Sequence, residues 1–483
     1  MSENSVIVIG GGVSGLTAAY RLHEEARERG LKLDVKLLEA SDHLGGVIRT
    51  VDHGDCLLEL GPDCFASNKP AGLEMTTELG LDDELIETNP AHRRSFILHK
   101  GKLKPLPQGF FLLAPMSVGA LLKTSVISWP GKFRMALELL KGKKKTPGDE
   151  SLADFVVRRF GKEALDRIAQ PMIAGIYTAD PLKLSLEATF PAFLEMEQEY
   201  GSVIKALRTK HKKTAKKGDA RPAGPRYSLF VTFKRGMRVL TEALEAKLPE
   251  GCARKGVEVR SITRNGDGWR VELAGGESMD AAAVISALPA PRAAAIVEAA
   301  NPALAGTLNS IPYAGAAVVN FIFERGQVKH PMDGIGCVIP AVEGRRIIAF
   351  SFSSVKFEGR APEGKAIVRV FMGGALQPQL AAKSEEELTQ IALEELRSLL
   401  GVEGEPLHSA VSRHGGAMAQ YHIGHLEKVA KAKEQAAEMA GYALIGNGFD
   451  GIGIPDCIRN ARAAAAEIVA EISKLRSGKT VIR

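Results

Sequence analysis

The segment SVIVIGGGVSGLTAAYRL, residues 5–22, decides the fold because it joins a strand, a glycine-rich turn and a helix. Its β-branched start, residues 5–9, is typical of a parallel strand that is covered on both faces. In the turn, Gly10 permits the tight bend, Gly12 lets backbone N–H groups approach a pyrophosphate, and Gly15 lets helix and strand pack closely. The spacing predicts a dinucleotide-binding βαβ unit.

A second strand, LDVKLLEAS at residues 33–41, carries an acidic side chain near its end. Glu39 is placed to accept hydrogen bonds from an adenosine ribose. Strand, loop, helix, strand and acid therefore follow one another in the order that a dinucleotide site requires. An exposed acid at a strand end is the structural alternative.

The stretch IGNGFDGIGIPDCIRNARAAAAEIV, residues 445–469, repeats the pattern of strand end, glycine-rich turn and helix. It lacks a following strand and a ribose-binding acid, so it does not predict a second nucleotide. Asp456 is expected to cap the helix, and the positive end of the helix dipole would face a negative group. An ordinary loop and helix is the alternative.

The composition is that of a globular protein with two or three domains, at 483 residues, 45% hydrophobic and 25% charged. Its five cysteines show no CxxC spacing, which favours reduced thiols and the cytoplasm. We expect no signal peptide. The longest apolar run, GFFLLAPMSVGALL at 109–122, is shorter than the ~20 residues of a spanning helix, so no transmembrane segment is predicted.

The net charge of +6 is concentrated in two runs, residues 141–148 and 205–226. Such runs are usually solvated loops, and the alternative is attraction to anionic lipid or to an acidic substrate. No aromatic platform or nucleic-acid reader motif accompanies them, so nucleic acid is not expected as a partner. No metal or nucleophile motif, such as HExxH or G-x-S-x-G, occurs either.

Further motifs sharpen the prediction: HLGGVIRT (43–50), LELGPDCF (58–65), QPMIAGIYTADPLKLSLEATFPAFLEMEQEYGSVI (170–204), QYHIGH (420–425) and GIGIPDCI (451–458). With the first turn, they make the chain resemble the bacterial protoporphyrinogen/coproporphyrinogen III oxidase family, within the FAD-containing amine oxidase superfamily. The resemblance spans almost the whole chain and implies FAD as the cofactor. It also implies that the two glycine-rich ends meet across one FAD, the first at its pyrophosphate and the last at its flavin.

The implied fold class is α/β (α+β), with a Rossmann-like FAD-binding domain, a mixed-sheet substrate domain and an inserted helical domain. Helical periodicity in residues 151–177, with Ser151 as a cap, and short strands within 256–289 agree with it. The expected ranges are 1–88, 227–300 and 426–483 for the FAD-binding domain, 89–114 and 301–425 for the substrate domain, 115–207 for the helical domain and 208–226 for a basic linker.

The resemblance assigns cofactor contacts residue by residue. They are Gly10, Gly11, Gly12, Val13, Ser14 and Gly15; Glu39 and Ala40; Gly45, Gly46 and Val47; Gly61, Pro62, Asp63 and Cys64; Val259; His414; and Gly451, Ile452, Gly453 and Ile454. His43 stands where the family usually has Arg or Lys, His414 where an aromatic residue is usual, and Ala419 where a proline is usual.

The implied activity is the oxidation of a porphyrinogen of haem biosynthesis, with O2 reduced to H2O2 and the flavin carrying the chemistry. No protein side chain is therefore predicted to be catalytic, and no metal is expected. Arg94 and Lys69 are the candidate cations for the substrate propionates, and the Gly175 carbonyl is the candidate partner of its pyrrole N–H groups. Surface charges and a helix-end glycine are the structural alternatives for these three residues.

Arg94 slightly favours protoporphyrinogen IX, and Lys69 keeps coproporphyrinogen III as the close alternative. An amine oxidase or carotenoid desaturase, and a non-catalytic tetrapyrrole-binding flavoprotein, are more distant ones. Residues 109–122, with Trp129 and the following lysines, predict either peripheral contact with the inner face of the cell membrane or a core segment of the substrate pocket. A haem-pathway enzyme is a further expected partner.

Overall fold

The computed structural model describes residues 4–107, 109–111, 114–144, 148–216 and 229–480. The first turn leads into a five-stranded parallel sheet of order β12-β2-β1-β16-β22. These strands are Ser5–Ile9 (β1), Asp34–Glu39 (β2), Ala253–Lys255 (β12), Ala283–Ser286 (β16) and Tyr442–Leu444 (β22). The β-branched run in β1 is fully buried, as expected of a strand that is covered on both faces.

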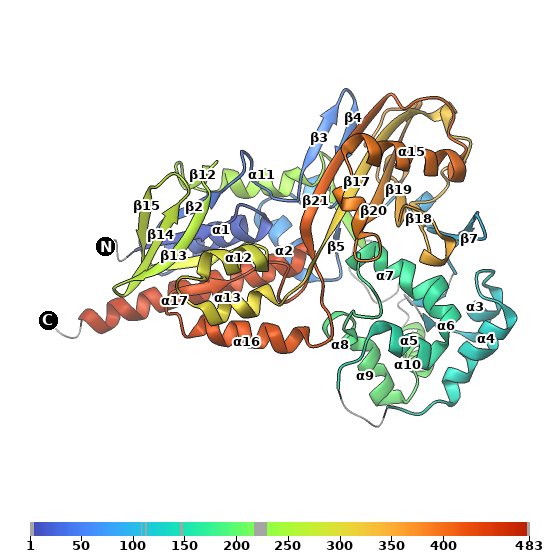
Figure 1. Ribbon diagram of the computed structural model, residues 1–483, viewed down its shortest axis with the longest axis horizontal. Helices are drawn as coiled ribbons and strands as arrows, with labels where there is room; N and C mark the ends of the chain where they lie inside the picture. Colours follow the sequence, from blue (N-terminus) through green and yellow to red (C-terminus); the bar gives the residue numbers. More distant parts are fainter. Residues whose placement is uncertain (1–3, 108, 112–113, 145–147, 217–228, 481–483) are drawn as a thin grey trace.

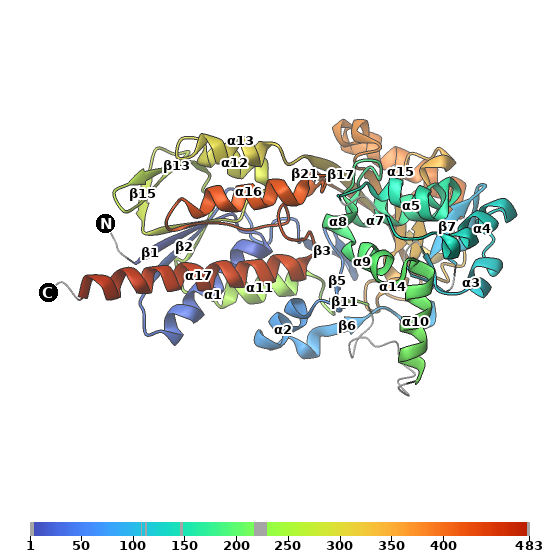
Figure 2. The same cartoon turned by 90° about the horizontal axis from the view of Figure 1, so that it is seen from below.

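The two ends of the chain pack together on one face of this sheet. Helix α1 (Val13–Glu28) and helix α17 (Ile454–Thr480) lie side by side, with α11 (Arg238–Ala246) next to them (Figures 1 and 2). Their apolar side chains form one core cluster that includes Leu16 and Ile458. Helix α2 (Pro70–Glu78) packs on α17.

The other face carries a second cluster, built from α12 (Ala290–Val297), α13 (Pro302–Asn309) and α16 (His425–Ala437). A three-stranded sheet of β13 (Val259–Asn265), β14 (Gly268–Leu273) and β15 (Ser278–Ala281) joins it. Because α13 packs against α12 and α16, residues 302–309 belong with the parallel sheet, although the sequence pattern assigned 301–425 to the substrate domain.

A seven-stranded mixed sheet of order β21-β17-β20-β19-β18-β7-β8 forms the second body. Its strands are Phe96–His99 (β7), Lys102–Pro105 (β8), Tyr313–Glu324 (β17), Gly336–Val338 (β18), Ala349–Phe352 (β19), Lys365–Gly373 (β20) and His408–Ala419 (β21). The pairing is antiparallel except between β7 and β18, which confirms the mixed sheet. Helix α15 (Glu385–Leu400) begins with a Ser384 capping box and covers one face.

The short helices and 3-10 turns of the inserted segment gather at the far end of the molecule from the start of β1 (Figure 1). They are Val118–Lys123 (α3), Trp129–Ala136 (α4), Leu152–Phe160 (α5), Lys162–Ala164 (α6), Gln170–Tyr177 (α7), Leu186–Thr189 (α8), Pro191–Tyr200 (α9) and Val203–Lys216 (α10). We call them the helical body. Ser151 caps α5 through the Asp154 N–H, as expected.

Helix α10 runs through residues 208–216, so the first half of the expected basic linker is helical. The rest, residues 217–226, lies outside the described residues. The remaining strands and the remaining helix are β3 (Thr50–His53), β4 (Cys56–Glu59), β5 (Phe65–Ala66), β6 (Leu85–Glu87), β9 (Phe110–Phe111), β10 (Ala114–Pro115), β11 (Phe230–Phe233) and α14 (Ser353–Lys356).

Among the described helices, none combines the length and the apolar character that a membrane span needs. The five cysteines are all free thiols, as the sequence spacing predicts.

Candidate functional site

The first glycine turn has the geometry that its spacing predicts. Gly10 has a φ of +104°, which side chains rarely tolerate. A Cβ on Gly15 would lie 1.8 Å from the Gly10 carbonyl oxygen, so only glycine lets α1 pack on β1 here. A Cβ on Gly12 would meet no atom within 4 Å. The surface at Gly12 is therefore open to a ligand, while Gly15 is closed by the protein itself.

Val13 and Ser14, which follow Gly12 and begin α1, lie toward the C-terminal helix α17. Val13 packs against the cluster of α1 and α17. Ser14 is buried beside the thiol of Cys457, whose pKa burial raises to about 11. The glycine-rich turn after β1 is therefore in contact with the first helical turn of α17.

Glu39 lies at the end of β2 and faces the same turn. Its carboxylate accepts hydrogen bonds from the Gly11 N–H at 2.6 Å and from the Ser41 N–H and hydroxyl, both at 2.8 Å. Ala40 is exposed next to it. A carboxylate held by three donors stays fixed beside the turn, where a ribose would lie.

The second glycine pair lies directly on the first turn. Gly45 donates its N–H to the Gly11 carbonyl at 2.8 Å, and a Cβ on Gly46 would lie 3.1 Å from the Gly12 Cα. Val47 is exposed, and a Cβ on Gly61 would lie 1.6 Å from the Val47 carbonyl oxygen. The three glycine motifs thus form one continuous backbone surface, which is a shape that fits an extended dinucleotide.

The loop from Gly61 to Cys64 is held by two buried cations of the substrate domain. Arg369, on β20, donates to the Gly61 carbonyl, and Lys356, at the end of α14, donates to the Asp63 carboxylate at 2.8 Å. Burial opposes ionisation of Asp63, but Lys356 and Arg369 outweigh it and hold the pKa of that carboxyl well below its usual range. With Asp63 ionised, these three side chains carry a net charge of +1.

The other side chains at this loop, including that of the nearby His414, are uncharged. Pro62 is half-buried, and burial raises the pKa of the Cys64 thiol to about 12, so this cysteine is neutral. The His414 Nε2 lies 2.8 Å from the Leu60 carbonyl oxygen, and burial lowers the pKa of its imidazole. His414 therefore donates to the backbone just before Gly61 as a neutral ring.

The C-terminal glycine loop bends over a buried carboxylate. Gly451 has a φ of +116°, and its N–H donates to the Tyr421 hydroxyl at 2.9 Å. Asp456 lies beneath this loop with 3% of its side chain exposed and pairs with Lys69 and with Arg459. The expectation that Asp456 caps α17 was wrong, because the helix begins two residues earlier and the carboxylate pairs with these cations instead.

The rest of the loop connects two bodies. Ile452 packs against the core of the helical body, and Ile454 packs against the cluster of α1 and α17. Gly453 accepts a hydrogen bond from the Cys457 N–H through its carbonyl, and a Cβ on it would lie 3.2 Å from the Asp456 carboxylate. Movement of this loop would thus disturb both bodies.

A pocket of about 550 Å³ lies where this loop, α2 and the helical body meet. Lys69, Gly451, Ile452 and Asp456 line it together with Tyr177 from the end of α7. Burial and the Asp456 carboxylate raise the pKa of Tyr177 to about 12, so its hydroxyl is a neutral donor. The structure therefore brings Lys69 next to two of the residues that were predicted to bind the flavin.

The other predicted residues lie outside this pocket's lining. Gly175 is exposed on α7, two residues before Tyr177, and a Cβ on it would lie 3.7 Å from Val338 of β18. Arg94 is 51% exposed and pairs with Asp333. Val259 begins β13, and its side chain belongs to the same core cluster as Ile9 and Leu38.

Sequence reasoning missed Asp456 as an ion-pair partner and missed Lys356, Arg369 and Tyr421. Arg369 had a signal, because it is the one charge within the apolar run AIVRVFMG, residues 366–373, and a buried charge must have a partner. No comparable pattern marks Lys356.

Comparison with known proteins identifies the family. The description "Flavin containing amine oxidoreductase" matches residues 13–469. A coproporphyrinogen III oxidase from Bacillus subtilis is 33% identical, with 96% of this chain and 98% of that protein covered. A chloroplastic protoporphyrinogen oxidase from Nicotiana tabacum is 28% identical, with 98% and 87% covered.

A solved structure from Exiguobacterium sp. 255-15, described as a candidate protoporphyrinogen oxidase, has a TM-score of 0.85 at 26% identity and covers 98% of this chain and 100% of that one. The glycine surface, the fixed Glu39 carboxylate at the end of β2 and the full-length similarity agree with one another. The chain therefore belongs to the flavin containing amine oxidoreductase family, in the group of the coproporphyrinogen III and protoporphyrinogen oxidases.

Proposed function

We propose that this chain is an FAD-dependent porphyrinogen oxidase of haem biosynthesis, which converts a porphyrinogen to the porphyrin and O2 to H2O2. The observation that carries the proposal is the 550 Å³ pocket, where Gly451 and Ile452 of the C-terminal glycine loop face Lys69 and Tyr177. Lys69, Arg459 and the Tyr177 hydroxyl line this pocket beside apolar side chains and the carboxylates of Glu74, Asp450 and Asp456. The two cations and the neutral hydroxyl are the groups that suit a tetrapyrrole with propionates.

When bound, FAD supplies the hydride acceptor for each of the three two-electron steps and returns the electrons to O2. The residues of the chain bind and orient the two molecules. The first-turn N–H groups of α17 present positive potential where negative charge would develop. Lys69 adds to it, and Asp456 holds Lys69 in place.

Between the two substrates, the geometry favours coproporphyrinogen III. Lys69, the position that resembles the coproporphyrinogen branch, lines the pocket, whereas Arg94, which favoured protoporphyrinogen IX, lies outside its lining. Coproporphyrinogen III has four propionates and protoporphyrinogen IX has two, so an added cation in the pocket matters more for the first. Protoporphyrinogen IX is the alternative.

A side-by-side assay of the two porphyrinogens by porphyrin fluorescence tests this proposal. We expect turnover of both porphyrinogens, with the larger kcat/KM for coproporphyrinogen III. The Lys69→Met variant should have a smaller difference between the two kcat/KM values. Turnover of neither would refute the family-level activity. Anaerobic mixing separates a catalyst, which bleaches the flavin absorbance, from a tetrapyrrole carrier, which leaves it oxidised.

We also propose that the helical body contacts the inner face of the cell membrane. Trp129 and Phe133 stand one turn apart on α4 and are 70% and 69% exposed, and Leu122 and Leu140 are exposed near them. Lys123, Lys141 and Lys143 are exposed in the same region. An apolar patch with lysines at its edge suits an anionic lipid surface.

Flotation with liposomes tests the membrane contact. The protein should float with anionic vesicles at low salt, and a Trp129→Ser, Phe133→Ser double variant should stay in the soluble fraction. As a matched control, Leu376→Ser alters another exposed apolar residue, in the substrate domain. If the wild-type protein also stays soluble, the patch serves another contact, such as a partner enzyme of the same pathway.

A further inference from the structure

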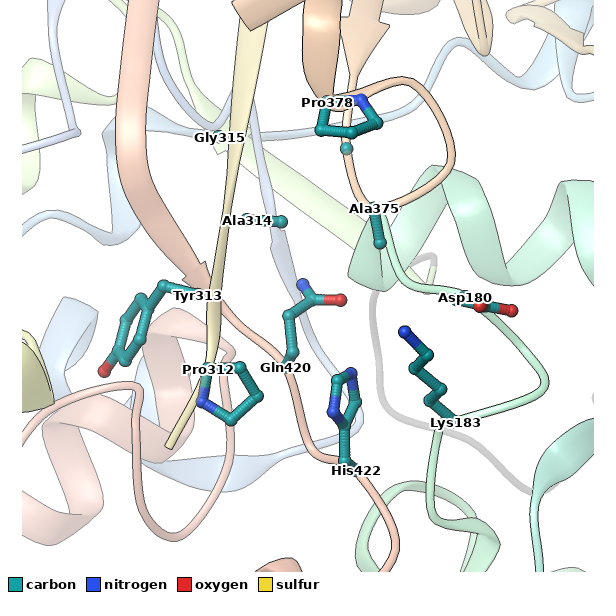
Figure 3. A pocket seen from close by; sticks show the side chains of 11 residues that line it. Asp180, Lys183, Pro312, Tyr313, Ala314, Gly315, Ala375, Pro378, Gln420 and His422 are labelled. Atoms are coloured by element: carbon teal, nitrogen blue, oxygen red, sulfur yellow. The ribbon is translucent and has the colours of Figure 1, made fainter. Parts of the chain in front are cut away.

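A second cavity, of about 210 Å³, lies where the helical body meets the end of the seven-stranded sheet (Figure 3). The loop after α7 supplies Asp180 and Lys183, and the segment after β21 supplies Gln420 and His422. Prolines and alanines, such as Pro312 and Ala375, give it an apolar wall. The proposed oxidase function uses none of these side chains.

Gln420 is the most informative of them because it is 2% exposed and only half satisfied. Its Nε2 donates to the Tyr177 carbonyl at 3.2 Å and to the Met418 carbonyl at 3.1 Å. Since both partners are acceptors, the amide orientation is determined, and the oxygen must point the other way. Within the described part of the chain, the Gln420 Oε1 has no hydrogen-bond partner.

Figure 3 shows this oxygen turned toward the interior of the cavity, on the side of Asp180 and Lys183. A buried acceptor without a donor costs on the order of 1–3 kcal/mol. Neighbouring atoms cover the oxygen in this conformation, so an occupant with an N–H or O–H group would remove that cost after a small rotation of the amide.

Asp180 and Lys183 bring opposite charges to the same space. Neither side chain forms an ion pair with any residue that the structure describes, and the Asp180 carboxylate accepts only the Leu182 N–H at 2.9 Å. Figure 3 shows the Lys183 ammonium directed toward the space between Gln420 and Asp180. Two acceptors and one cation thus face a cavity of about 210 Å³.

We propose that this cavity binds a small amino carboxylate, whose carboxylate pairs with Lys183 and whose ammonium group donates to the Gln420 Oε1 and to Asp180. The ligand complements both signs of charge at once, which neither a simple acid nor a simple amine does. The apolar wall accepts its short methylene chain.

The site is linked to the larger pocket through a single side chain. The Gln420 amide nitrogen holds the carbonyl of Tyr177, and Tyr177 lines the 550 Å³ pocket. The next residue, Thr178, has a left-handed φ of +50°, and its carbonyl accepts the Ala375 N–H at 2.8 Å. An occupant that bonds to Gln420 therefore restrains the end of α7, next to the substrate.

Calorimetric titration of the FAD-loaded enzyme, without porphyrinogen, tests the site with 4-aminobutyrate as the probe. We expect one saturable site, with acetate and butylamine at least tenfold weaker because each satisfies only half of the polar groups. Equal affinity for all three compounds, or no saturation up to about 10 mM 4-aminobutyrate, would overturn the proposal.

Two variants and a control make the test specific to the cavity. Lys183→Met and Gln420→Met should each weaken 4-aminobutyrate binding at least tenfold, while Lys247→Met, at an exposed lysine after α11, should leave it unchanged. Unchanged binding in either cavity variant contradicts the assigned contacts, and the comparison of the three compounds stands even where a variant does not fold.

Hydrogen exchange tests the link to α7. Saturation with 4-aminobutyrate should slow amide exchange in residues 170–178 in the wild-type protein and not in Gln420→Met. Equal exchange with and without the ligand would refute the coupling. These readouts need no turnover, so they are independent of the proposed oxidase activity.

Discussion

Individual glycines in the first turn meet two different demands. A side chain at Gly15 would collide with the Gly10 carbonyl, whereas one at Gly12 would project into open space. The fold requires Gly15, and the cofactor requires Gly12. The glycine spacing in the sequence already predicts this division, and the structure shows its steric basis.

Alanine at these two positions should separate folding from cofactor binding. We expect Gly15→Ala to lower the free energy of unfolding of the apoprotein by about 1–3 kcal/mol, because the 1.8 Å approach forces strand and helix apart. Gly12→Ala should change it by less than about 0.5 kcal/mol and weaken FAD binding at least tenfold. Urea denaturation and FAD titration measure the two effects, and equal loss of both properties in the two variants would contradict this division.

The buried charges at Gly61 should tune the bound flavin. Lys356→Met removes one positive charge from the group of Lys356, Arg369 and Asp63, so the reduction potential should fall by on the order of 30 mV. Asp63→Asn removes the negative charge and should raise the potential. Spectroelectrochemical titration measures both shifts, with Lys255→Met, an exposed lysine paired with Glu245, as the control. Equal potentials in all variants would mean that the flavin lies away from this loop.

At the scale of an element, the helices of the helical body are joined by buried ion pairs. Arg159 of α5 is fully buried and lies 3.4 Å from the Glu138 carboxylate and 3.0 Å from the Glu197 carboxylate, both also fully buried. Burial raises the pKa of Glu197, but Arg158 and Arg159 outweigh it, so the carboxylate is ionised. Three segments of the helical body therefore meet at one guanidinium.

Removal of this guanidinium should destabilise the helical body strongly. We expect Arg159→Met to cost about 3–5 kcal/mol, because it leaves two carboxylates buried without this partner. Lys162→Met, which breaks an exposed pair with Asp166, should cost at most about 0.5 kcal/mol. Circular dichroism during urea denaturation gives both values, and a loss below about 1 kcal/mol for Arg159→Met would contradict the expected role.

Sequence patterns predicted local contacts better than contacts between distant parts of the chain. The cap at Ser151 was confirmed because its bond is local, to the N–H three residues later. The role of Asp456 was wrong because its partner Lys69 lies 387 positions away. Residues 208–216 of the expected basic linker continue α10, since lysines are good helix formers.

At the scale of the whole molecule, histidines that are partly or fully buried make stability depend on pH. Burial lowers the pKa of each of seven described imidazoles: His23, His99, His330, His408, His414, His422 and His425. Below a pH of about 6.5 the unfolded chain binds protons that the folded chain does not. Stability is thus full above the unfolded pKa and declines as the pH falls toward the folded values.

His425 should account for a measurable share of this acid sensitivity. Burial lowers the pKa of His425 to about 4, which corresponds to about 3 kcal/mol lost between pH 6.5 and pH 4. His425→Phe keeps the stacking on Tyr421 and removes the titration, so its stability should fall less steeply over this range. Urea denaturation at several pH values checks this, and parallel curves for the two proteins would contradict it.

The sequence by itself determined the dinucleotide turn, the acid after the second strand and the family, because glycine spacing and strand order are local properties with few physical solutions. It also predicted the mixed sheet and the inserted helices. Only the tertiary structure decided the partners of charged side chains: Lys69 with Asp456, Arg94 with Asp333, and Asp63 with Lys356. Ion pairing depends on distances of a few ångström, and positions in a sequence do not define such distances until the chain has packed.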